Sequence, residues 1–459
     1  MFILMVVVFI LGYTAIALEH PLKVDKAASA LILGTLCWVI YILGAKEIIQ
    51  AGLSPAWESY ISSNPGEHGT EAIREFIVDH EIIRHIGEIA EILFFLLGAM
   101  TIVEVVDQHD GFKIITDRIK TTHKVKLLWI LSFLTFFMSA LLDNLTTTIV
   151  LVALLRKLVD DKPTKWFFAS MIALAANAGG AWSPIGDVTT IMLWIGGQIT
   201  TLRIIEGVIL PSLTCLVIPL IILSFTWKGH VTRPPLKKKE TEISTPQESL
   251  LFLILGIGGL LSVPVFKTAT HLPPYMGMLL ALGLIWVVGE IVHRNKPHEI
   301  KGKLKVINIL RRVDVPTVLF FLGILSAVAA LQSAGHLHLL AQYLDKKLGN
   351  IYLIDMAIGV ISSVVDNVPL VAGAMGMYPV HAAGVAGYLA NFVQDGLFWE
   401  FLAYTAGTGG SLLIIGSAAG VAAMGLEKID FIWYMKRISL LALFGYLGGG
   451  AVYYMLSVL

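Results

Sequence analysis

The chain has 459 residues, of which 56% are apolar and only 14% are charged, whereas soluble domains carry about 25% charged residues. The formal net charge is zero, so the charge balance points to neither a nucleic acid nor an acidic partner. Apolar runs of membrane-spanning length recur from end to end and indicate a polytopic helical membrane protein.

The N-terminal segment and the cysteines do not change this class. Residues 1–17 are apolar without a basic leading region, and Ala15-Ile16-Ala17 is a poor cleavage site, so we expect a first transmembrane helix rather than a cleaved signal. Cys37 and Cys215 lie in separate apolar runs and indicate neither a disulfide framework nor a metal site.

Apolar segments follow one another along the whole chain. The stretch 232–247 separates them into two groups and is the predicted cytoplasmic linker. The segments lie at about 1–17, 29–45, 89–106, 126–142, 148–158, 166–199, 204–226, 249–265, 275–291, 314–333, 351–380, 397–426 and 431–457.

Two stretches do not fit simple crossings. A single helix over 126–158 would be ~50 Å long, too long for one crossing and too short for two with a turn. Its middle is interrupted by Asp143-Asn144 and both its ends are basic, so we predict a re-entrant hairpin with this pair at the tip. Such backbone is tolerated at membrane depth only where it lines a cavity or is buried in protein. Residues 351–380 form the same pattern around Asp366-Asn367, 223 positions later.

Each predicted hairpin is followed by an interrupted helix. The first, 166–198, is interrupted at 177–187, and the second, 397–426, is interrupted at 407–411. Both interruptions are rich in glycine, and the first contains proline, so we expect the helix to open there. The order helix, hairpin, broken helix therefore occurs twice, at offsets of 223 to 230, and indicates an internal duplication.

Orientation follows from the basic residues. Because cytoplasmic loops carry an excess of lysine and arginine, we predict an outside N-terminus and ten crossing helices, with the first hairpin opening to the cytoplasm and the second to the outside. The acidic stretch 46–88 then lies outside, and the basic loops inside are 107–126, 156–165, 227–247 and 293–312. The predicted fold is an all-α polytopic membrane protein of two inverted repeats, 1–231 and 248–459, each with five transmembrane helices, a re-entrant hairpin and a broken helix.

Polar side chains gather at the hairpin tip and helix break of the first half. A buried charge in hydrocarbon costs at least ~2.5–3.5 kcal/mol, so an intramembrane aspartate is a functional hypothesis by default. Oxygen ligands suit a hard cation, although Asp143 and Asp187 could also act only as helix N-caps. The candidate cation- and proton-binding residues are Asp143, Asn144, Thr146, Thr147, Asn177, Ser183, Asp187, Thr189 and Thr190, with Na⁺ held by Asp143, Asn144, Asn177 and Asp187.

The second half offers a less charged site. No carboxylate there matches Asp187, so we place the main ion site in the first half, and Asp366 could be only a cap for its hairpin. The second-half site would consist of Ser363, Asp366, Asn367, Thr408 and Ser411, with Ser362 and Ser417 nearby. Separately, Glu88 and Glu91 begin an apolar helix and could serve proton uptake.

The motifs resemble one transporter family over essentially the whole chain. Leu-Asp-Asn-Leu-Thr-Thr-Thr at 142–148, the long run Asn-Ala-Gly-Gly-Ala-Trp-Ser-Pro-Ile-Gly-Asp-Val-Thr-Thr at 177–190, and Val-Asp-Asn-Val-Pro-Leu at 365–370 are similar to those of NhaD-type sodium/proton antiporters of the ion-transporter superfamily. The resemblance implies secondary active exchange of cytoplasmic Na⁺ or Li⁺ for external H⁺, without a cofactor. It also implies a homodimer in the lipid bilayer of the bacterial cytoplasmic (inner) membrane, with a scaffold domain and a transport domain.

The alternative is a Na⁺-coupled carrier of an oxyanion or dicarboxylate. In the sodium-coupled carboxylate carriers of this superfamily the hairpin tips look like Ser-Asn-Thr, whereas both tips here begin with aspartate. No lysine or arginine lies at the centres of the four broken segments, which favours a cation as substrate. The chain has no Walker loop, nucleotide fingerprint, HExxH or GxSxG, which argues against an ATP-driven pump, an intramembrane hydrolase and a nucleotide partner.

Overall fold

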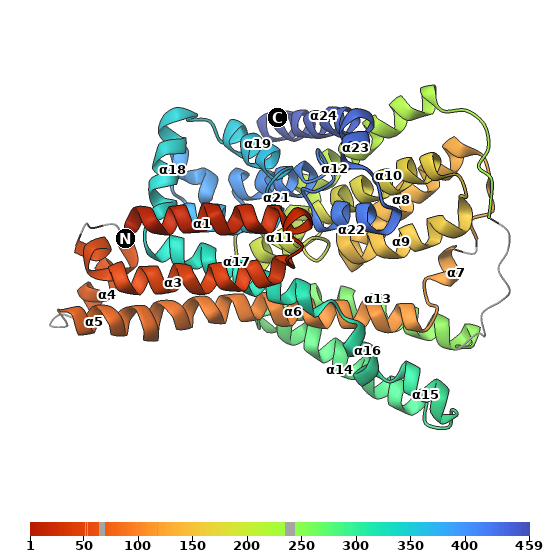
Figure 1. Ribbon diagram of the computed structural model, residues 1–459, viewed down its shortest axis with the longest axis horizontal. Coiled ribbons are helices and arrows are strands. Elements are labelled where there is room, and N and C mark those ends of the chain that lie inside the picture. The colour runs from red at the N-terminus through yellow and green to blue at the C-terminus, as the bar shows by residue number, and fades with distance from the viewer. Residues whose placement is uncertain (51, 53, 64–68, 117, 235–243) are drawn as a thin grey trace. The chain divides into compact units, whose positions relative to one another are not determined.

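The computed structural model describes the chain apart from residues 51, 53, 64–68, 117 and 235–243, and its regular elements over the described part are helices (Figure 1). The chain forms two compact units, which are described separately. Unit 1 comprises 1–93, 314–354 and 368–381, and unit 2 comprises 94–313, 355–367 and 382–459. Each unit draws on both halves of the sequence. Residues 235–243 of the predicted linker lie outside the described part.

Unit 1 is built from the N-terminal helices and a segment after residue 313. Helix α6 continues from it into unit 2, and so does α19. Its elements are α1 (Phe2–Ala17), α2 (Glu19–Leu22), α3 (Lys26–Gln50), α4 (Pro55–Ser63), α5 (Thr70–Glu75), η1 (Phe76–Ile82), the start of α6 (Ile83–Gln108), α17 (Val315–Ser333), α18 (His336–Lys347), the start of α19 (Ile351–Ile361) and most of α20 (Asn367–Met377).

The packing of α3 on α17 holds unit 1 together. A side chain at Gly34 would overlap the carbonyl of Gly323, and one at Gly323 would overlap the backbone of Ala30. The two backbones approach this closely only because both positions are glycine. Two side chains of α3 reinforce the pair, since Trp38 Nε1 donates to Ser326 Oγ at 3.1 Å and the Tyr41 hydroxyl donates to Ser333 O at 3.2 Å.

Unit 2 contains the predicted first hairpin, both broken helices and the tip of the second hairpin. Its elements after α6 are α7 (Lys113–Thr116), α8 (Lys124–Leu142), α9 (Asn144–Leu158), α10 (Lys162–Ala181), α11 (Val188–Ile195), α12 (Thr201–Thr226), α13 (Pro246–Thr270), α14 (Pro274–Val292), α15 (His298–Leu304), α16 (Val306–Ile309), η2 (Leu310–Arg312), η3 (Gly387–Phe392), α21 (Leu397–Gly409), α22 (Ala418–Glu427), α23 (Phe431–Arg437) and α24 (Ser439–Val458).

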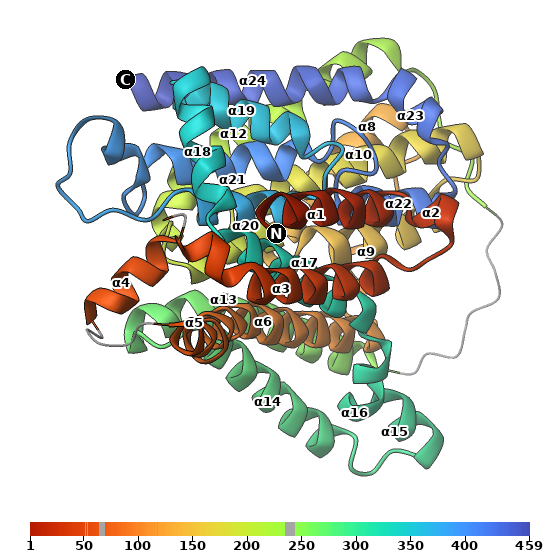
Figure 2. The ribbon, with the colours of Figure 1, turned by 60° about the vertical axis from the view of Figure 1, so that its left-hand side comes forward.

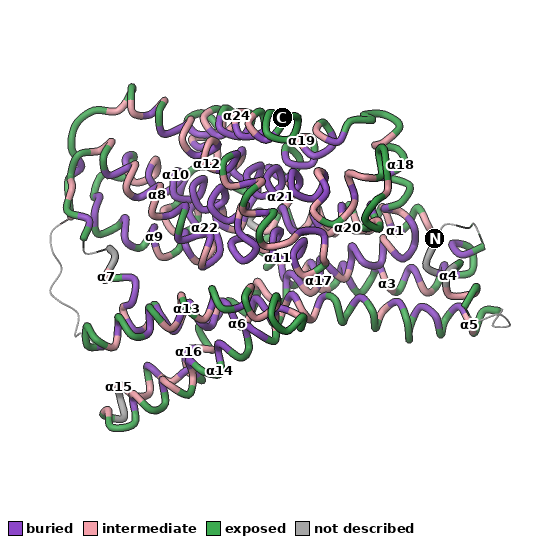
Figure 3. Tube along the Cα trace, turned by 180° about the vertical axis from the view of Figure 1, so that it is seen from behind, coloured by how far each residue is buried: buried purple, intermediate pink, exposed green. Residues whose placement is uncertain are grey.

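Helices α10 and α21 form the core of unit 2. Every residue of 168–181 and of 398–409 is buried, as the colouring of both helices shows (Figure 3). A helix that is buried all round needs no polar face, so its polar residues call for a specific partner. Both helices end in a non-helical break, at 182–187 after α10 and at 410–417 after α21.

The breaks begin later than the sequence predicts. The run Asn177–Ala181 remains helical as the end of α10, and 407–409 remains helical as the end of α21. Glycines in a buried helix let neighbouring backbones approach closely. These glycine-rich runs therefore form packing surfaces at the ends of the two helices, and the breaks follow them. The stretch 46–88 also differs from a simple acidic loop, because α5, η1 and α6 form helix from Thr70 to Gln108.

The first hairpin has both of its ends at one place in unit 2. The Lys124 amide donates to Gly229 O at 3.0 Å, and the Asp160 amide donates to Thr232 O at 2.9 Å. Gly229 and Thr232 are three residues apart, which is at most roughly 11 Å of chain. The start of α8 and the end of α9 therefore lie together, while Asp143 joins the two helices at their other ends.

Corresponding contacts recur in the two halves. Ser139 Oγ donates to Ala176 O at 2.6 Å, and Ser362 Oγ, 223 positions after Ser139, donates to Ala406 O at 2.9 Å. Each contact joins a hairpin arm to the helix that precedes a break. This agreement supports the duplication, while the inverted orientation of the repeats and the bounds 1–231 and 248–459 remain predictions.

The described chain contains eight helices long and apolar enough to cross a membrane. Seven coincide with predicted crossings, and the eighth is α8, the first arm of the predicted hairpin. Helix α1 has 16 residues, and α11, α21 and α22 have 8, 13 and 10, so all four are too short to be counted among the eight. Helix α10 has 20 residues and is long enough, but it is not apolar enough to be counted. The protein is thus an all-α polytopic membrane protein.

Two histidines make a buried contact where α6 and α14 end. His109 Nδ1 lies 2.6 Å from Val105 O and therefore carries the hydrogen, so its Nε2 accepts from His293 Nε2 at 3.1 Å. Burial lowers the pKa of His109 to about 4 and lowers that of His293, and the nearby Lys296 ammonium lowers both further. Glu248 opposes this shift, but its carboxylate is paired with Lys296 at 2.6 Å.

We expect the hairpin ends to face the cytoplasm together. Cysteines introduced at Lys124 and at Lys162 should both react with an impermeant thiol reagent added from the cytoplasmic side, since the two ends of the hairpin lie beside one short segment. The native Cys37 and Cys215 are buried and give a low background. Labelling of the two positions from opposite sides would contradict a re-entrant path.

The histidine pair predicts a stability change with pH. Between pH 6.5 and about 4 the unfolded chain binds a proton that folded His109 does not, so the free energy of unfolding should fall as pH is lowered through this window. The loss reaches about 3 kcal/mol at its lower end. Unfolding in detergent should show a smaller loss for His109→Phe, which keeps a ring against Phe252 but cannot titrate. If the free energy of unfolding fell equally with pH in the wild-type protein and in His109→Phe, His109 would not be the group responsible.

Candidate functional site

Asn177, near the end of α10, is the centre of a hydrogen-bonded group in unit 2. Its Nδ2 donates to Ser411 Oγ at 2.9 Å and to Ser417 Oγ at 2.8 Å, and its Oδ1 accepts from Asn144 Nδ2 at 3.1 Å. Asn144 Nδ2 also donates to Asp187 Oδ2 at 2.6 Å. All five side chains are buried.

Asn367, at the tip of the second hairpin, completes the group. Its Nδ2 lies 3.4 Å from both carboxylate oxygens of Asp187. The central cluster is defined here as Asn144, Asn177, Asp187, Asn367, Ser411 and Ser417. It draws on both hairpin tips and both helix breaks. The sequence predicts separate first-half and second-half sites, but the structure joins Asn367 and Ser411 to the first-half residues in one cluster.

Asp187 and Ser417 occupy matching places 230 positions apart. Asp187 begins α11 with φ −145° and ψ 144°, and Ser417 begins α22 with φ −148° and ψ 154°. Asp187 Oδ1 accepts from the Thr189 amide at 3.0 Å and from Thr189 Oγ1 at 2.9 Å. Ser417 Oγ accepts from the Gly420 amide at 3.1 Å. The duplicated helix start thus carries a charge in one half and a hydroxyl in the other.

Asp143 lies at the junction of α8 and α9 with an unusual backbone conformation. Its φ of 94° is rare for a residue with a side chain and costs of order 1–3 kcal/mol. Its carboxylate accepts from the Thr146 amide at 2.8 Å and from Thr146 Oγ1 at 2.7 Å. Asp143 is therefore an N-cap of α9, and its charge, like that of Asp366, is also close enough to act on Asp187.

Several predicted site residues bond to the backbone instead of to the cluster. Ser183 Oγ and Thr190 Oγ1 donate to carbonyls of Ala140 and Gly180, at 2.5 Å and 3.4 Å. Such bonds brace the helix break against its neighbours. In the second half Ser363 Oγ donates to Val360 O at 2.7 Å and Thr408 Oγ1 to Tyr404 O at 2.6 Å.

Thr147 behaves differently, because its buried Oγ1 has no hydrogen-bond partner among the described residues. Thr147 follows Asp143 and Asn144 by one turn of α9. A buried hydroxyl without a partner is rare in proteins and invites a ligand or water. Thr147 is the one predicted residue of the first half whose oxygen is left open in this way within the described part.

The charges around the central cluster favour a cation. Helix N-termini attract anions, and α9 and α11 both begin here. The backbone amides at these two helix starts, however, already donate hydrogen bonds to the carboxylates of Asp143 and Asp187. In the part of the chain that the structure describes, no lysine or arginine bonds to a member of the cluster.

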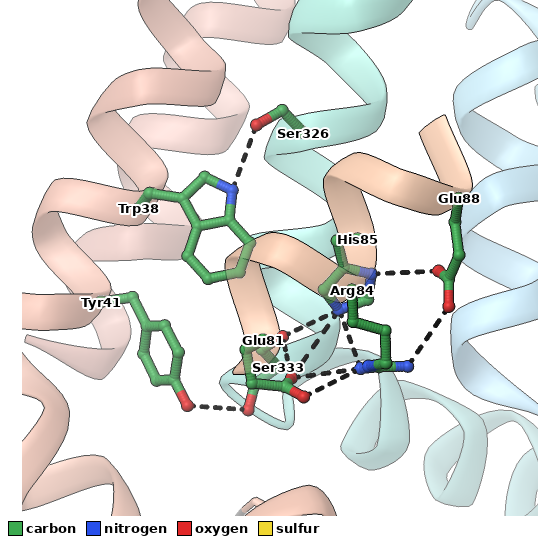
Figure 4. Close-up of polar contacts among 8 residues, drawn as sticks. All are labelled: Trp38, Tyr41, Glu81, Arg84, His85, Glu88, Ser326 and Ser333. Carbon is green, nitrogen blue, oxygen red and sulfur yellow. Dashed lines mark hydrogen bonds and ion pairs between the residues drawn. The ribbon is translucent and has the colours of Figure 1, made fainter. Parts of the chain in front are cut away.

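A second polar group lies in unit 1, around the π-helical turn η1 (Figure 4). The Glu81 cluster is defined as Glu81, Arg84, His85, Glu88 and Ser333. The buried Glu81 carboxylate accepts from Ser333 Oγ at 2.5 Å and from Arg84 Nη2 at 3.0 Å. His85 Nε2 lies 3.0 Å from Ser333 Oγ, and its Nδ1 lies 3.3 Å from Glu88. π-helical turns often mark functional sites.

Of the two residues of the predicted proton path, the structure places Glu88 in this cluster. The Glu88 side chain is 59% exposed and lies 3.5 Å from Arg84 Nη1. Glu91 follows it by nearly one turn of α6 and is half-buried. Sequence reasoning missed Glu81, which it assigned to an acidic loop. The signal was the spacing of positions 81, 84, 85 and 88, which puts all four side chains on one helix face.

Comparison with known proteins identifies relatives over nearly the full length. The citrate transporter family profile matches residues 5–393. Sodium/proton antiporter 2 of Arabidopsis thaliana is 41% identical, with 98% of each chain covered, and sodium/proton antiporter 1 of the same plant is 44% identical over 98% of this chain and 71% of its own length. The Na(+)/H(+) antiporter NhaD of Vibrio cholerae is 30% identical over 94% of this chain and 86% of its own.

The central position of Asn177 predicts a large effect of its removal. Asn177→Ala would remove three buried hydrogen bonds, to Ser411, Ser417 and Asn144, so the free energy of unfolding should fall by about 1–3 kcal/mol or more. Denaturant unfolding in detergent measures this. The matched control is Asn391→Ala, which removes one hydrogen bond to Tyr388 O in an outer turn and should cost less than about 0.5 kcal/mol. Equal effects of the two substitutions would show that the cluster does not stabilise the fold.

Proposed function

The chain belongs to the citrate transporter family and, within it, to the NhaD-type sodium/proton antiporters, and from this premise we propose that it exchanges cytoplasmic Na⁺ for external H⁺ as a secondary transporter. The observation that carries the proposal is the central cluster. Its carboxylate, Asp187, is buried, is reached by amides from both hairpins, and has no cationic partner among the described residues.

The proposed mechanism is competition of Na⁺ and H⁺ for one site. Asp187, on which the charge of Asp143 also acts, offers negative charge and hard oxygen atoms, which suit a small cation. A proton on the carboxylate removes that charge, and a bound cation disfavours the proton. Each ion therefore releases the other when the site faces the opposite side of the membrane. Asn144, Asn177 and Thr147 can supply further oxygens, because an amide can turn its oxygen toward the ion.

Alternating access is proposed on the basis of the duplicated elements. Both hairpin tips contact Asp187, and both helix breaks contribute to the same cluster. In transporters built from inverted repeats, the ion binds where broken helices meet, and one bundle moves against the other. A homodimer in the bacterial cytoplasmic membrane remains part of the proposal, as does a proton path through Glu88 and Glu91, supported by the exposed Glu88 carboxylate beside the Glu81 cluster.

The second candidate function is transport of an anion such as a carboxylate, coupled to Na⁺. The family profile and the helix N-termini at the cluster favour it. The carboxylates that already cap α9 and α11 oppose it, since they would repel an anion from the same amides. Exchange is the stronger proposal because the fixed charge at the cluster is negative.

Exchange by the purified protein in proteoliposomes tests the proposal. Sodium addition should dissipate an imposed pH gradient, and the apparent affinity for Na⁺ should weaken about 10-fold per pH unit once protons occupy the site, as competition at one group requires.

Asp187→Asn and Asp143→Asn should abolish exchange, Asp366→Asn should leave a reduced rate, and Asp187→Glu should shift the pH profile. A sodium affinity independent of pH would contradict competition. Sodium-dependent citrate uptake without proton movement would establish the anion carrier instead.

A further inference from the structure

Asp355 is a buried carboxyl group in the first arm of the second hairpin. It lies in α19, and none of its surface is exposed. The buried positions of this helix include Ile351, Ile354 and Ile358, at helical spacing around Asp355. An aspartate therefore occupies one place in an otherwise apolar stripe, which is why the apolar pattern of 351–361 conceals it in the sequence.

The Asp355 carboxylate has no partner in the described part of the chain. Both oxygens are buried and neither accepts or donates a hydrogen bond. The neighbouring titratable side chain is Tyr446 of α24, but the Tyr446 hydroxyl donates to the Met356 carbonyl at 2.9 Å. Helix α19 lies close to α24 and α21 in both ribbon views (Figure 2). None of these contacts supplies a positive charge.

Glu400 of α21 provides a contrast within the same unit. It is also buried, at 4% exposed, but Arg203 Nη2 lies 3.2 Å from its Oε1. The Tyr453 hydroxyl donates to its Oε2 at 3.3 Å. Glu400 thus has a positive side chain and a hydroxyl donor beside it, whereas an ionised Asp355 would be an isolated charge in the protein interior.

An isolated buried carboxylate is strongly unfavourable, whereas the neutral acid is tolerated. Asp355 therefore carries a proton in the conformation of this structure. Its helix leads directly to the hairpin tip, where Asn367 contacts Asp187 in the central cluster. One hairpin thus links a protonated acid to the carboxylate on which we place the cation.

We propose that Asp355 is a second proton-binding residue of the transport cycle, distinct from the central cluster. A proton from water on one side adds to a carboxylate oxygen, and the same O–H bond breaks to return the proton to water on the other side when the hairpin changes its surroundings. The inference rests on the proposed exchange of Na⁺ for H⁺. It adds one proton to each cycle beyond those that compete with Na⁺.

Proteoliposome measurements of coupling test the inference. The number of protons moved per sodium ion should fall by one in Asp355→Asn. It is obtained from the Na⁺ gradient at which net exchange stops under a fixed pH gradient, with the membrane potential clamped at zero. Asparagine has nearly the same shape as the neutral acid, so the fold should be retained. Glu400→Gln is the matched control, since it also removes a buried carboxyl group but should leave the ratio unchanged. An unchanged ratio in Asp355→Asn would overturn the inference.

Infrared difference spectroscopy decides the case in which Asp355→Asn is folded but inactive. Addition of saturating Na⁺ to the wild-type protein should remove a C=O stretching band of a protonated carboxyl group, and part of that loss should be missing in Asp355→Asn. Identical difference spectra for the two proteins would overturn the inference. A wild-type protein that shows no sodium-driven proton movement would refute the exchange function itself, and this is measured before any variant is compared.

Discussion

An ionised carboxylate inside a helical membrane protein must be offset by a specific group or by a proton, because neither lipid nor apolar side chains can solvate it. In unit 2, free amides at helix starts offset Asp143 and Asp187. In unit 1, Arg84 offsets Glu81. The breaks after α10 and between the hairpin arms follow from this requirement, because a continuous helix has already used its amides internally and can offer none to a carboxylate.

Glycine makes it sterically feasible for the hairpins to reach the breaks. A side chain at Gly179 of α10 would overlap the carbonyl of Phe136, and one at Gly409 of α21 would overlap that of Gly359. These contacts occupy corresponding positions in the two halves, offset by 230 residues for the glycines and 223 for their partners. The glycine runs therefore form the surfaces on which the hairpin arms pack. The helices α10 and α21 end only after these runs.

Local features allowed the hairpins and breaks to be predicted from sequence, since an Asp-Asn pair within an apolar run and a glycine-rich run each disturb a helix where they stand. The meeting of the two halves could not be predicted in that way. Asn177 finds Ser411 only because α10 packs on α21, which no local pattern encodes. Glu81 and Asp355 were missed for a related reason. Whether a buried carboxyl group is ionised depends on whether a charged side chain from another helix lies beside it, and the local sequence does not show this.

Asp187 is the point at which both hairpins meet one titratable group. Its oxygens face the side-chain amides of Asn144 and Asn367, each of which begins a hairpin helix. A cation on the carboxylate would repel the amide hydrogens, so both asparagines would have to turn their oxygens toward the ion or withdraw. A proton would instead remove the charge and let the acid donate to one amide oxygen. We infer that the contacts between Asp187 and the two hairpin asparagines differ between the sodium-bound and the protonated states. Such a difference between bound states is what a ligand needs in order to shift a conformational equilibrium.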